Sequence, residues 1–207
     1  DWTTSYVGHF LLEAQNAGFP VPDEILTKWT SYQNNIAQGW FPKRNNRQDD
    51  RSQLMQAYRL YTLALAGSPS LSSMNRLKEH GQINEMAQWR LAAAYQLAGQ
   101  HRVAKEMVKG LSKTVDVYRE LSNTFGSALR DKAMILETLV LLDSTKDAVL
   151  VARDVSKGLT DKQWLSTQET AFALVALARF GLTEESGSPI EMSYTLAGGA
   201  KQTISNP

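Results

Sequence analysis

The segment Trp164–Gly181, WLSTQETAFALVALARFG, constrains the fold most, because its central residues are apolar on every side. Ser166-Thr167-Gln168-Glu169 has the form of a capping box, in which the Ser and Glu side chains each bind the other residue's backbone N–H. From Ala171 to Ala178 no residue is polar, yet the run is shorter than the roughly 20 apolar residues of a membrane span. We therefore expect a helix that begins near Ser166 and is enclosed by other helices.

Helical patterns recur along the rest of the chain, separated by glycine, proline and capping residues. Asp23 is expected to cap the second helix, and Pro42–Arg51 is expected to be a polar loop. The stripe expected to face the core from the second helix consists of Ile25, Leu26, Trp29, Tyr32 and Ile36. The expected helices are Trp2–Ala17, Asp23–Gly39, Ser52–Ala66, Ser70–His80, Asn84–Gly99, His101–Leu111, Ala128–Leu142 and Lys146–Leu159.

The helices are organised as repeats. The Ala/Leu-rich segments YTLALAG and YQLAG end at Gly67 and Gly99, 32 residues apart, and LVLLD and ALARFG end at Asp143 and Gly181, 38 residues apart. Periods in this range are typical of helical hairpins. In each hairpin one helix is almost wholly apolar, whereas its partner carries charges such as Lys105 and Arg153. This asymmetry predicts an inner and an outer layer. An open superhelix and a closed ring both satisfy it, and the uneven repeat lengths favour the ring.

Composition narrows the classes of function. The 22 basic and 21 acidic residues give a net charge of +1, which offers no electrostatic attraction for nucleic acid or an anionic membrane. Cysteine is absent, which excludes disulfides, thiolate metal sites and cysteine nucleophiles. The chain opens on Asp1 with no leader pattern, so we expect a segment of a longer protein.

The C-terminal residues follow a different pattern. Ile190, Met192, Tyr194 and Leu196 alternate with other residues, which predicts a β-strand over 189–196, and Gly198-Gly199 reads as a turn. We expect this strand to lack a partner within the chain, and to be mobile or to pair with a second copy. The predicted fold class is all-α, an incomplete ring of helical hairpins with a short C-terminal strand.

No residue pattern predicts a catalytic, cofactor-binding or metal site. The three histidines, His9, His80 and His101, share no ligand spacing and are interpreted as structural or solvated. Asp49-Asp50 is half of the carboxylate pair that a glycosidase needs, but the neighbouring arginines Arg44, Arg47 and Arg51 favour a solvated loop. A zinc-dependent prenyltransferase ring is disfavoured by the missing cysteine.

Other large side chains are assigned to packing. Five tryptophans are spread along the chain, at positions 2, 29, 40, 89 and 164, and could suggest carbohydrate stacking. Trp2, Trp29 and Trp89 fall within helical patterns and are predicted to be core residues. Met134 and Met192 are interpreted as gap-fillers.

Two of these segments also carry a resemblance to a known family. DWTTSYVGHFLLEA, at Asp1–Ala14, resembles the Trp-x-Thr-Ala-Tyr-Val helix of the thioester domain of α2-macroglobulins and complement components. WLSTQETAFALVAL resembles the Ser-Thr-Gln-x-Thr helix near the end of that domain. The long Ala-rich hairpins are most similar to the large bacterial members, and the resemblance covers about Asp1–Thr183.

The resemblance implies an α/α toroid. It divides the chain into residues 1–183, a thioester-like toroid domain lacking its first helices, and residues 184–207, a linker and strand of the following β-domain. It implies a non-enzymatic part of a bacterial protease inhibitor, or protease trap, in the periplasm or cell envelope, with a lipid-anchored parent. The implied partners are proteases and adjacent β-rich macroglobulin domains, with no cofactor, no nucleic acid and no direct membrane insertion.

The family's thioester motif, Cys-Gly-Glu-Gln, lies upstream of the Trp helix and is not in this sequence. Some members also carry a His after the second helix that directs acyl transfer to hydroxyl groups. The matching stretch here, GWFPKRNNRQDDRSQ at 39–53, has none, which favours amine acceptors if the parent has a thioester. Two alternatives to this function remain. The first is a helical-repeat module that binds a protein or peptide, and the second is a toroid glycosidase with two facing carboxylates.

Overall fold

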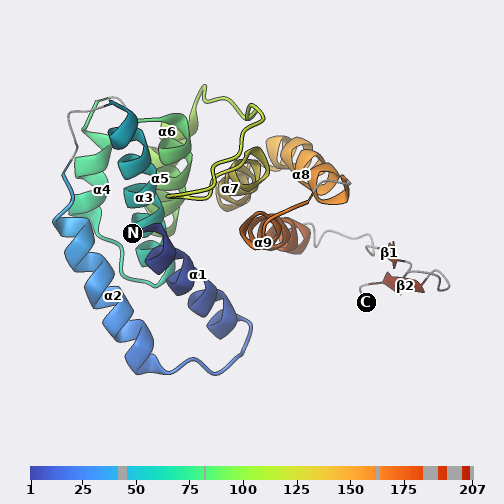
Figure 1. Ribbon diagram of the computed structural model, residues 1–207, viewed down its shortest axis with the longest axis horizontal. Helices are drawn as coiled ribbons and strands as arrows, with labels where there is room; N and C mark the ends of the chain where they lie inside the picture. Colours follow the sequence, from blue (N-terminus) through green and yellow to red (C-terminus); the bar gives the residue numbers. More distant parts are fainter. Residues whose placement is uncertain (42–45, 82, 162–163, 184–190, 195–201, 206–207) are drawn as a thin grey trace.

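The computed structural model describes residues 1–41, 46–81, 83–161, 164–183, 191–194 and 202–205. Within these ranges it contains nine α-helices followed by a two-stranded antiparallel sheet (Figure 1). The helices are α1 (Trp2–Asn16), α2 (Asp23–Gln38), α3 (Asn46–Leu65), α4 (Leu71–Lys78), α5 (Glu85–Leu97), α6 (His101–Val108), α7 (Ala128–Leu141), α8 (Thr145–Thr160) and α9 (Thr167–Thr183). The all-α class and each expected helix are confirmed. None of these helices combines the length and apolar character that crossing a bilayer requires.

The odd-numbered helices form the inner layer. Along the chain, α1 packs on α3, α3 on α5, α5 on α7 and α7 on α9. The even-numbered helices lie against one or two of these, with α6 on α5 and α8 on α7 and α9 (Figure 1). The inner helices supply most of the core, including the fully buried side chains Tyr58, Tyr61, Trp89, Leu91 and Met134. The predicted two layers of helical hairpins are thus confirmed.

Burial of the inner helices is uneven. In α5 the run Trp89–Tyr95 is wholly buried, including three successive alanines that let neighbouring helices approach closely. In α9, by contrast, Leu174 is 55% exposed and Leu182 is 69% exposed. The prediction that α9 is enclosed on all sides is therefore wrong within this chain. The helix packs on α7 and α8, and Leu174 and Leu182 stay exposed in the described residues.

The start of α9 confirms the capping box. The backbone N–H of Glu169 donates to the Ser166 hydroxyl at 3.2 Å, and the Ser166 N–H donates to the Glu169 carboxylate at 2.8 Å. Two N–H groups that the first helical turn leaves without partners are thereby satisfied.

Two other predictions fail near helix starts. Helix α3 begins at Asn46 rather than Ser52, so part of the expected polar loop is helical. Asp23 is the first residue of α2, and Pro22 occupies the capping position.

The predicted apolar stripe of α2 is largely exposed. Trp29 is buried, but Ile25 and Tyr32 are each 48% exposed and Ile36 is 38% exposed. The helix is rotated so that Gln33 is buried instead. Its side chain donates to the Ser5 hydroxyl and accepts from the Arg59 guanidinium, which makes burial of this polar residue favourable.

The sheet consists of β1 (Glu191–Tyr194) and β2 (Gln202–Ser205), with Met192 opposite Ile204. Strand β1 lies inside the segment that the sequence pattern assigned to a strand. The expectation that it lacks a partner in the chain is wrong, because β2 pairs with it. The Gly198-Gly199 turn lies outside the described residues.

Helices α1 and α2 cross closely at Gly8. A Cβ atom added at Gly8 would lie 1.9 Å from the Trp29 indole, and that indole donates a hydrogen bond to the Thr4 carbonyl at 2.8 Å. The indole thus occupies the space that any larger residue at position 8 would need.

We predict that Gly8→Ala lowers the free energy of unfolding by about 2 kcal/mol or more, because the indole must leave its site. Gly181→Ala is the matched control, since a Cβ there meets nothing within 4 Å and alanine favours the helix by about 0.5–1 kcal/mol. Urea unfolding of both variants measures the difference. Equal stability of G8A and wild type would contradict this packing.

Candidate functional site

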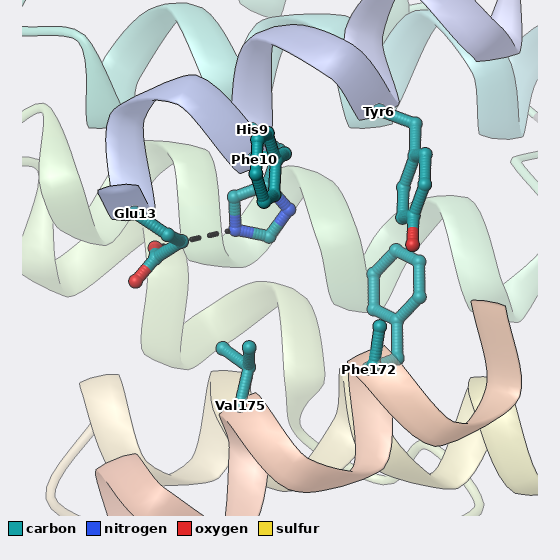
Figure 2. A pocket seen from close by; sticks show the side chains of 7 residues that line it. Tyr6, His9, Phe10, Glu13, Phe172 and Val175 are labelled. Atoms are coloured by element: carbon teal, nitrogen blue, oxygen red, sulfur yellow. Dashed lines mark ion pairs between the residues drawn. The ribbon is translucent and has the colours of Figure 1, made fainter. Parts of the chain in front are cut away.

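An apolar groove runs between the first and the last helix. Helices α1 and α9 lie side by side and enclose a cavity of about 80 Å³ (Figure 2). Phe10 stands at its edge with 66% of its surface exposed, whereas Phe172 is buried at its base. The lining residues are Tyr6, His9, Phe10, Glu13, Ala171, Phe172 and Val175.

One end of the groove is closed by a hydrogen bond between the starts of the two helices. The Trp2 indole N–H donates to the Gln168 side-chain oxygen at 2.8 Å. The Gln168 amide then donates to the carbonyls of Thr124 and Phe125. Trp2 also stacks on Tyr58 of α3, with ring centroids 4.4 Å apart. The two segments that carry the family resemblance therefore contact each other directly.

The other end is closed by an ion pair, in which the Arg179 guanidinium of α9 binds the Glu13 carboxylate of α1. Because the N-terminal ends of α1 and α9 contact each other, and so do their C-terminal ends, the two helices run in the same direction. Between the two ends, the Tyr6 and Phe172 rings stack at 5.8 Å. Long side chains thus join two helices whose backbones are not in close contact.

A buried carboxylate lies beneath the groove. Glu137 of α7 is only 2% exposed and binds two guanidinium groups, Arg90 of α5 and Arg179 of α9. The Arg179 bond measures 2.5 Å, and the Tyr61 hydroxyl of α3 donates to the same carboxylate at 2.9 Å. The Arg90 guanidinium also lies 4.2 Å from the centroid of the Tyr61 ring. One carboxylate therefore links α3, α5, α7 and α9.

The electrostatics of this cluster fix its protonation. Burial alone would raise the pKa of Glu137, but the charges of Arg90 and Arg179 outweigh burial and lower this pKa to about 2. Burial and the adjacent Glu137 charge raise the pKa of the Tyr61 hydroxyl. Burial would lower the pKa of Arg179, but Tyr61 and the two carboxylates raise it. The cluster thus holds an ionised carboxylate, two cations and a neutral phenol.

His9 connects the groove to this cluster. Its side chain is buried, with Nδ1 3.0 Å from the Tyr58 hydroxyl and Nε2 3.4 Å from the Glu13 carboxylate. Burial removes Glu13 from water, which raises its pKa, but the hydrogen bond with His9 and the charge of Arg179 lower it overall. His9 therefore orders a buried polar cluster, in keeping with its structural interpretation.

The other candidate residues are not brought together. His80 is partly buried beside the Trp40 ring, and His101 is exposed next to Gln96. No group of three or more potential metal ligands occurs among the described residues. Asp49 and Asp50 lie in α3, but their side chains lie outside the described residues.

The packing assignments hold where they are tested. Trp2, Trp29, Trp89 and Met134 are buried, as predicted. Trp164 is 74% exposed under the Arg119 guanidinium, which no pattern indicated. Met192 is in β1, and its side chain lies outside the described residues.

Sequence reasoning missed the buried guanidinium groups. Arg90, Arg130 and Arg59 are all at most 4% exposed. A signal was available for Arg90 and Glu137, because each is a charged residue within a mainly apolar run, WRLAAAY for Arg90 and AMILETLVL for Glu137. Since a buried charge requires a partner, a basic residue in one such run and an acidic residue in another are expected to pair. For Arg59, whose pKa burial lowers, the partners are the amides of Gln33 and Gln56, which no pattern revealed.

The buried Glu137 carboxylate does not suit acid–base catalysis. It accepts three hydrogen bonds and stays ionised at neutral pH, so it can neither donate a proton nor reach a substrate. What the arrangement provides is a rigid polar centre beneath an apolar groove.

Comparison with known proteins agrees with these observations. No protein-family model matches the chain. Two α2-macroglobulins, from two strains of Xylella fastidiosa, are each 27% identical over 190 residues, which cover 86% of this chain and 11% of the relative. The native conformation of Escherichia coli α2-macroglobulin matches with a TM-score of 0.71 and 21% identity, over 98% of this chain and 13% of that one.

Over most of its length, the chain is thus similar to bacterial α2-macroglobulins. Salmonella α2-macroglobulin reacted with methylamine has the same fold, with a TM-score of 0.70 and 22% identity over 99% of this chain and 13% of that one. The matching region also occurs in an E. coli α2-macroglobulin fragment that extends from domain MG7 to the C-terminus. The E. coli protein has further been solved after activation by porcine elastase and by trypsin. This chain therefore corresponds to a small part of these relatives.

We predict that the Glu137 cluster makes this chain sensitive to acid. Because the folded pKa of Glu137 lies below its unfolded value, its contribution is complete above about pH 4.5 and is lost as pH falls towards 2. The loss amounts to about 3 kcal/mol. Chemical unfolding between pH 7 and pH 2 measures it.

Glu137→Gln should lower stability at pH 7 by about 3–5 kcal/mol, because the buried Arg90 guanidinium loses its carboxylate and Arg179 keeps only that of Glu13. Its stability curve should approach that of wild type as the pH nears 2. Glu24→Gln is the control, because Glu24 pairs with Lys28 on the exposed surface of α2. Parallel pH curves for E137Q and wild type would show that Glu137 is not the group responsible.

Proposed function

We propose that this chain is the helical scaffold of the thioester-type domain of a bacterial α2-macroglobulin-like protease inhibitor. In this proposal residues 1–183 belong to an α/α toroid, and residues 184–207 lead into a β-rich neighbouring domain. The chain performs no catalysis itself. It supports a protease trap formed by a longer polypeptide, which we call the parent.

The contacts between α1 and α9 carry the proposal. In an open superhelix, each repeat touches only its neighbours, so the first and last helices stay apart. Here Trp2 binds Gln168, and Glu13 binds Arg179. These contacts support a ring, and they disfavour the alternative of a helical-repeat module with an extended concave face.

The apolar groove supports a ring that is completed by other parts of the parent. Phe10 and Leu174 are more than half exposed on helices that otherwise belong to the inner layer. Exposed apolar surface of this kind commonly marks an interface. In our proposal, a helix that precedes Asp1 in the parent lies between α1 and α9 and covers these residues.

The thioester itself is assigned to the parent. This chain contains no cysteine and cannot form the bond. The Salmonella relative was solved after reaction with methylamine, an amine that attacks thioesters, which supports a thioester upstream of Asp1. If the parent carries one, the absence of histidine at 39–53 favours transfer to amines rather than to hydroxyl groups.

The same relatives support the proposed partners, and the proposal adds a location. The E. coli protein was activated by trypsin and by elastase, which supports proteases as partners of the parent. We propose that other partners are the β-rich domains of the parent, and that it resides in the periplasm or cell envelope with a lipid anchor. No nucleic acid is expected, since the charges balance at +1.

Reaction of the intact parent with methylamine tests the proposed function. Before limited proteolysis, mass spectrometry should show one methylamine incorporated, with the appearance of one free thiol. After proteolysis, the thioester should have reacted with the protease instead. A correctly folded parent that incorporates no methylamine and releases no thiol would reject covalent capture.

A second prediction tests the completed ring. Phe10→Asp in the parent should lower its free energy of unfolding by about 2 kcal/mol or more, because a charge would be buried against the added helix. Phe19→Asp is the control, since Phe19 is equally exposed at 65% but does not line the groove. It should change stability by about 0.5 kcal/mol or less. Equal effects of the two substitutions would argue against an occupied groove.

A further inference from the structure

The connection between α6 and α7 contains a strand-like segment within the helical part of the chain. Residues 114–119, TVDVYR, contain Thr, two Val and Tyr, which favour extended structure. The backbone is not helical here, and it forms one isolated antiparallel bridge, between Arg119 and Ser127. The connection is visible in yellow-green between α6 and α7 (Figure 1). Connections of this length without helix or strand usually have a functional role.

This segment is paired on one side, and only at its C-terminal end. The Tyr118 carbonyl accepts from the Ala128 N–H, and the Glu120 N–H donates to the Gly126 carbonyl. Because backbone groups alternate sides along an extended chain, those of Val117 and Arg119 point the opposite way. In the described part of the chain, the N–H groups of Val115 and Val117 donate no backbone hydrogen bond.

Several apolar side chains in and next to this segment are exposed, as expected where no neighbouring strand covers them. Val117 is 97% exposed, although valine in a strand normally packs against a neighbour. Leu121 follows at 82% exposure, and Tyr118 is 41% exposed. An exposed edge strand with apolar side chains is a template for pairing with another strand.

The segment is nevertheless held firmly. The Tyr118 hydroxyl donates to the buried Asp131 carboxylate at 2.6 Å, and the Trp89 indole donates to the Ser112 carbonyl at 3.1 Å. Val115 packs against the core, and Arg119 pairs with Glu169 of α9. A fixed edge loses little conformational entropy on binding, so it is prepared to accept a strand.

We infer that Thr114–Arg119 is a docking edge for a β-strand of another domain of the parent. Free N–H and C=O groups along an extended backbone are matched by the backbone of a second extended strand. The inference rests on the proposed function, because this chain spans only 11% of its curated relatives and the strand is assigned to the remainder. A strand tethered in the same polypeptide reaches an effective concentration on the order of millimolar, which favours it over a separate molecule.

Hydrogen exchange of the intact parent tests this inference. The Val115, Val117 and Arg119 amides should exchange at least about 100-fold more slowly than in an unstructured peptide. Val117→Pro removes one outward N–H and should abolish protection at Val115 and Arg119. It should also abolish protection in one segment outside this chain, and that segment is the docked strand.

Asp116→Pro is the matched control, because the Asp116 N–H points towards the paired side and donates no hydrogen bond there. It should retain protection at Val115 and Arg119, and amides of α7 should stay protected in both variants, which verifies folding. Exchange of Val117 at the unstructured rate would overturn the inference. So would protection that falls on dilution, which would indicate pairing between two copies.

The outcomes separate this inference from the proposed function. Protected amides in a parent that incorporates no methylamine would support the docking edge and reject covalent capture. Unprotected amides in a parent that does incorporate methylamine would reject the docking edge alone.

Discussion

The arrangement of the inner helices depends on one buried carboxylate. Glu137 binds Arg90 and Arg179 and accepts from Tyr61, so a single side chain links four inner helices. Buried charges contribute little net stability compared with apolar packing, but removing one partner leaves the others uncompensated. The helices must therefore meet in a register that brings these groups together. Arg179 extends the same constraint to α1 through Glu13.

The constraint explains why an apolar groove persists beside a well-packed core. Arg179 and Gln168 span the distance between α9 and α1, so the two helices are held in place without backbone contact. Between these contacts, Tyr6, Phe10 and Val175 surround a cavity rather than close on each other (Figure 2). A scaffold of this kind fixes both walls of the groove before any further helix is added, which fits the role proposed for it in an α2-macroglobulin-like parent.

Local patterns in the sequence predicted the helices well, and tertiary contacts limited the rest. Ser166 and Glu169 predicted the start of α9, because capping depends on residues close in sequence. The exposed stripe Ile25, Tyr32 and Ile36 was mistaken for core, since periodicity cannot show that Gln33 pairs with Arg59. The groove could not be predicted either, because Trp2 and Gln168 are brought together only by the ring of helices between them.

In the proposed parent, the groove between α1 and α9 holds a further helix, and a cryo-EM structure of the intact parent would show whether it does. We expect a helix from the region preceding Asp1 that lies between α1 and α9 and covers Phe10, with the Glu13–Arg179 and Trp2–Gln168 contacts retained. A groove open to solvent in the folded parent, or one in which α1 and α9 have separated, would contradict it.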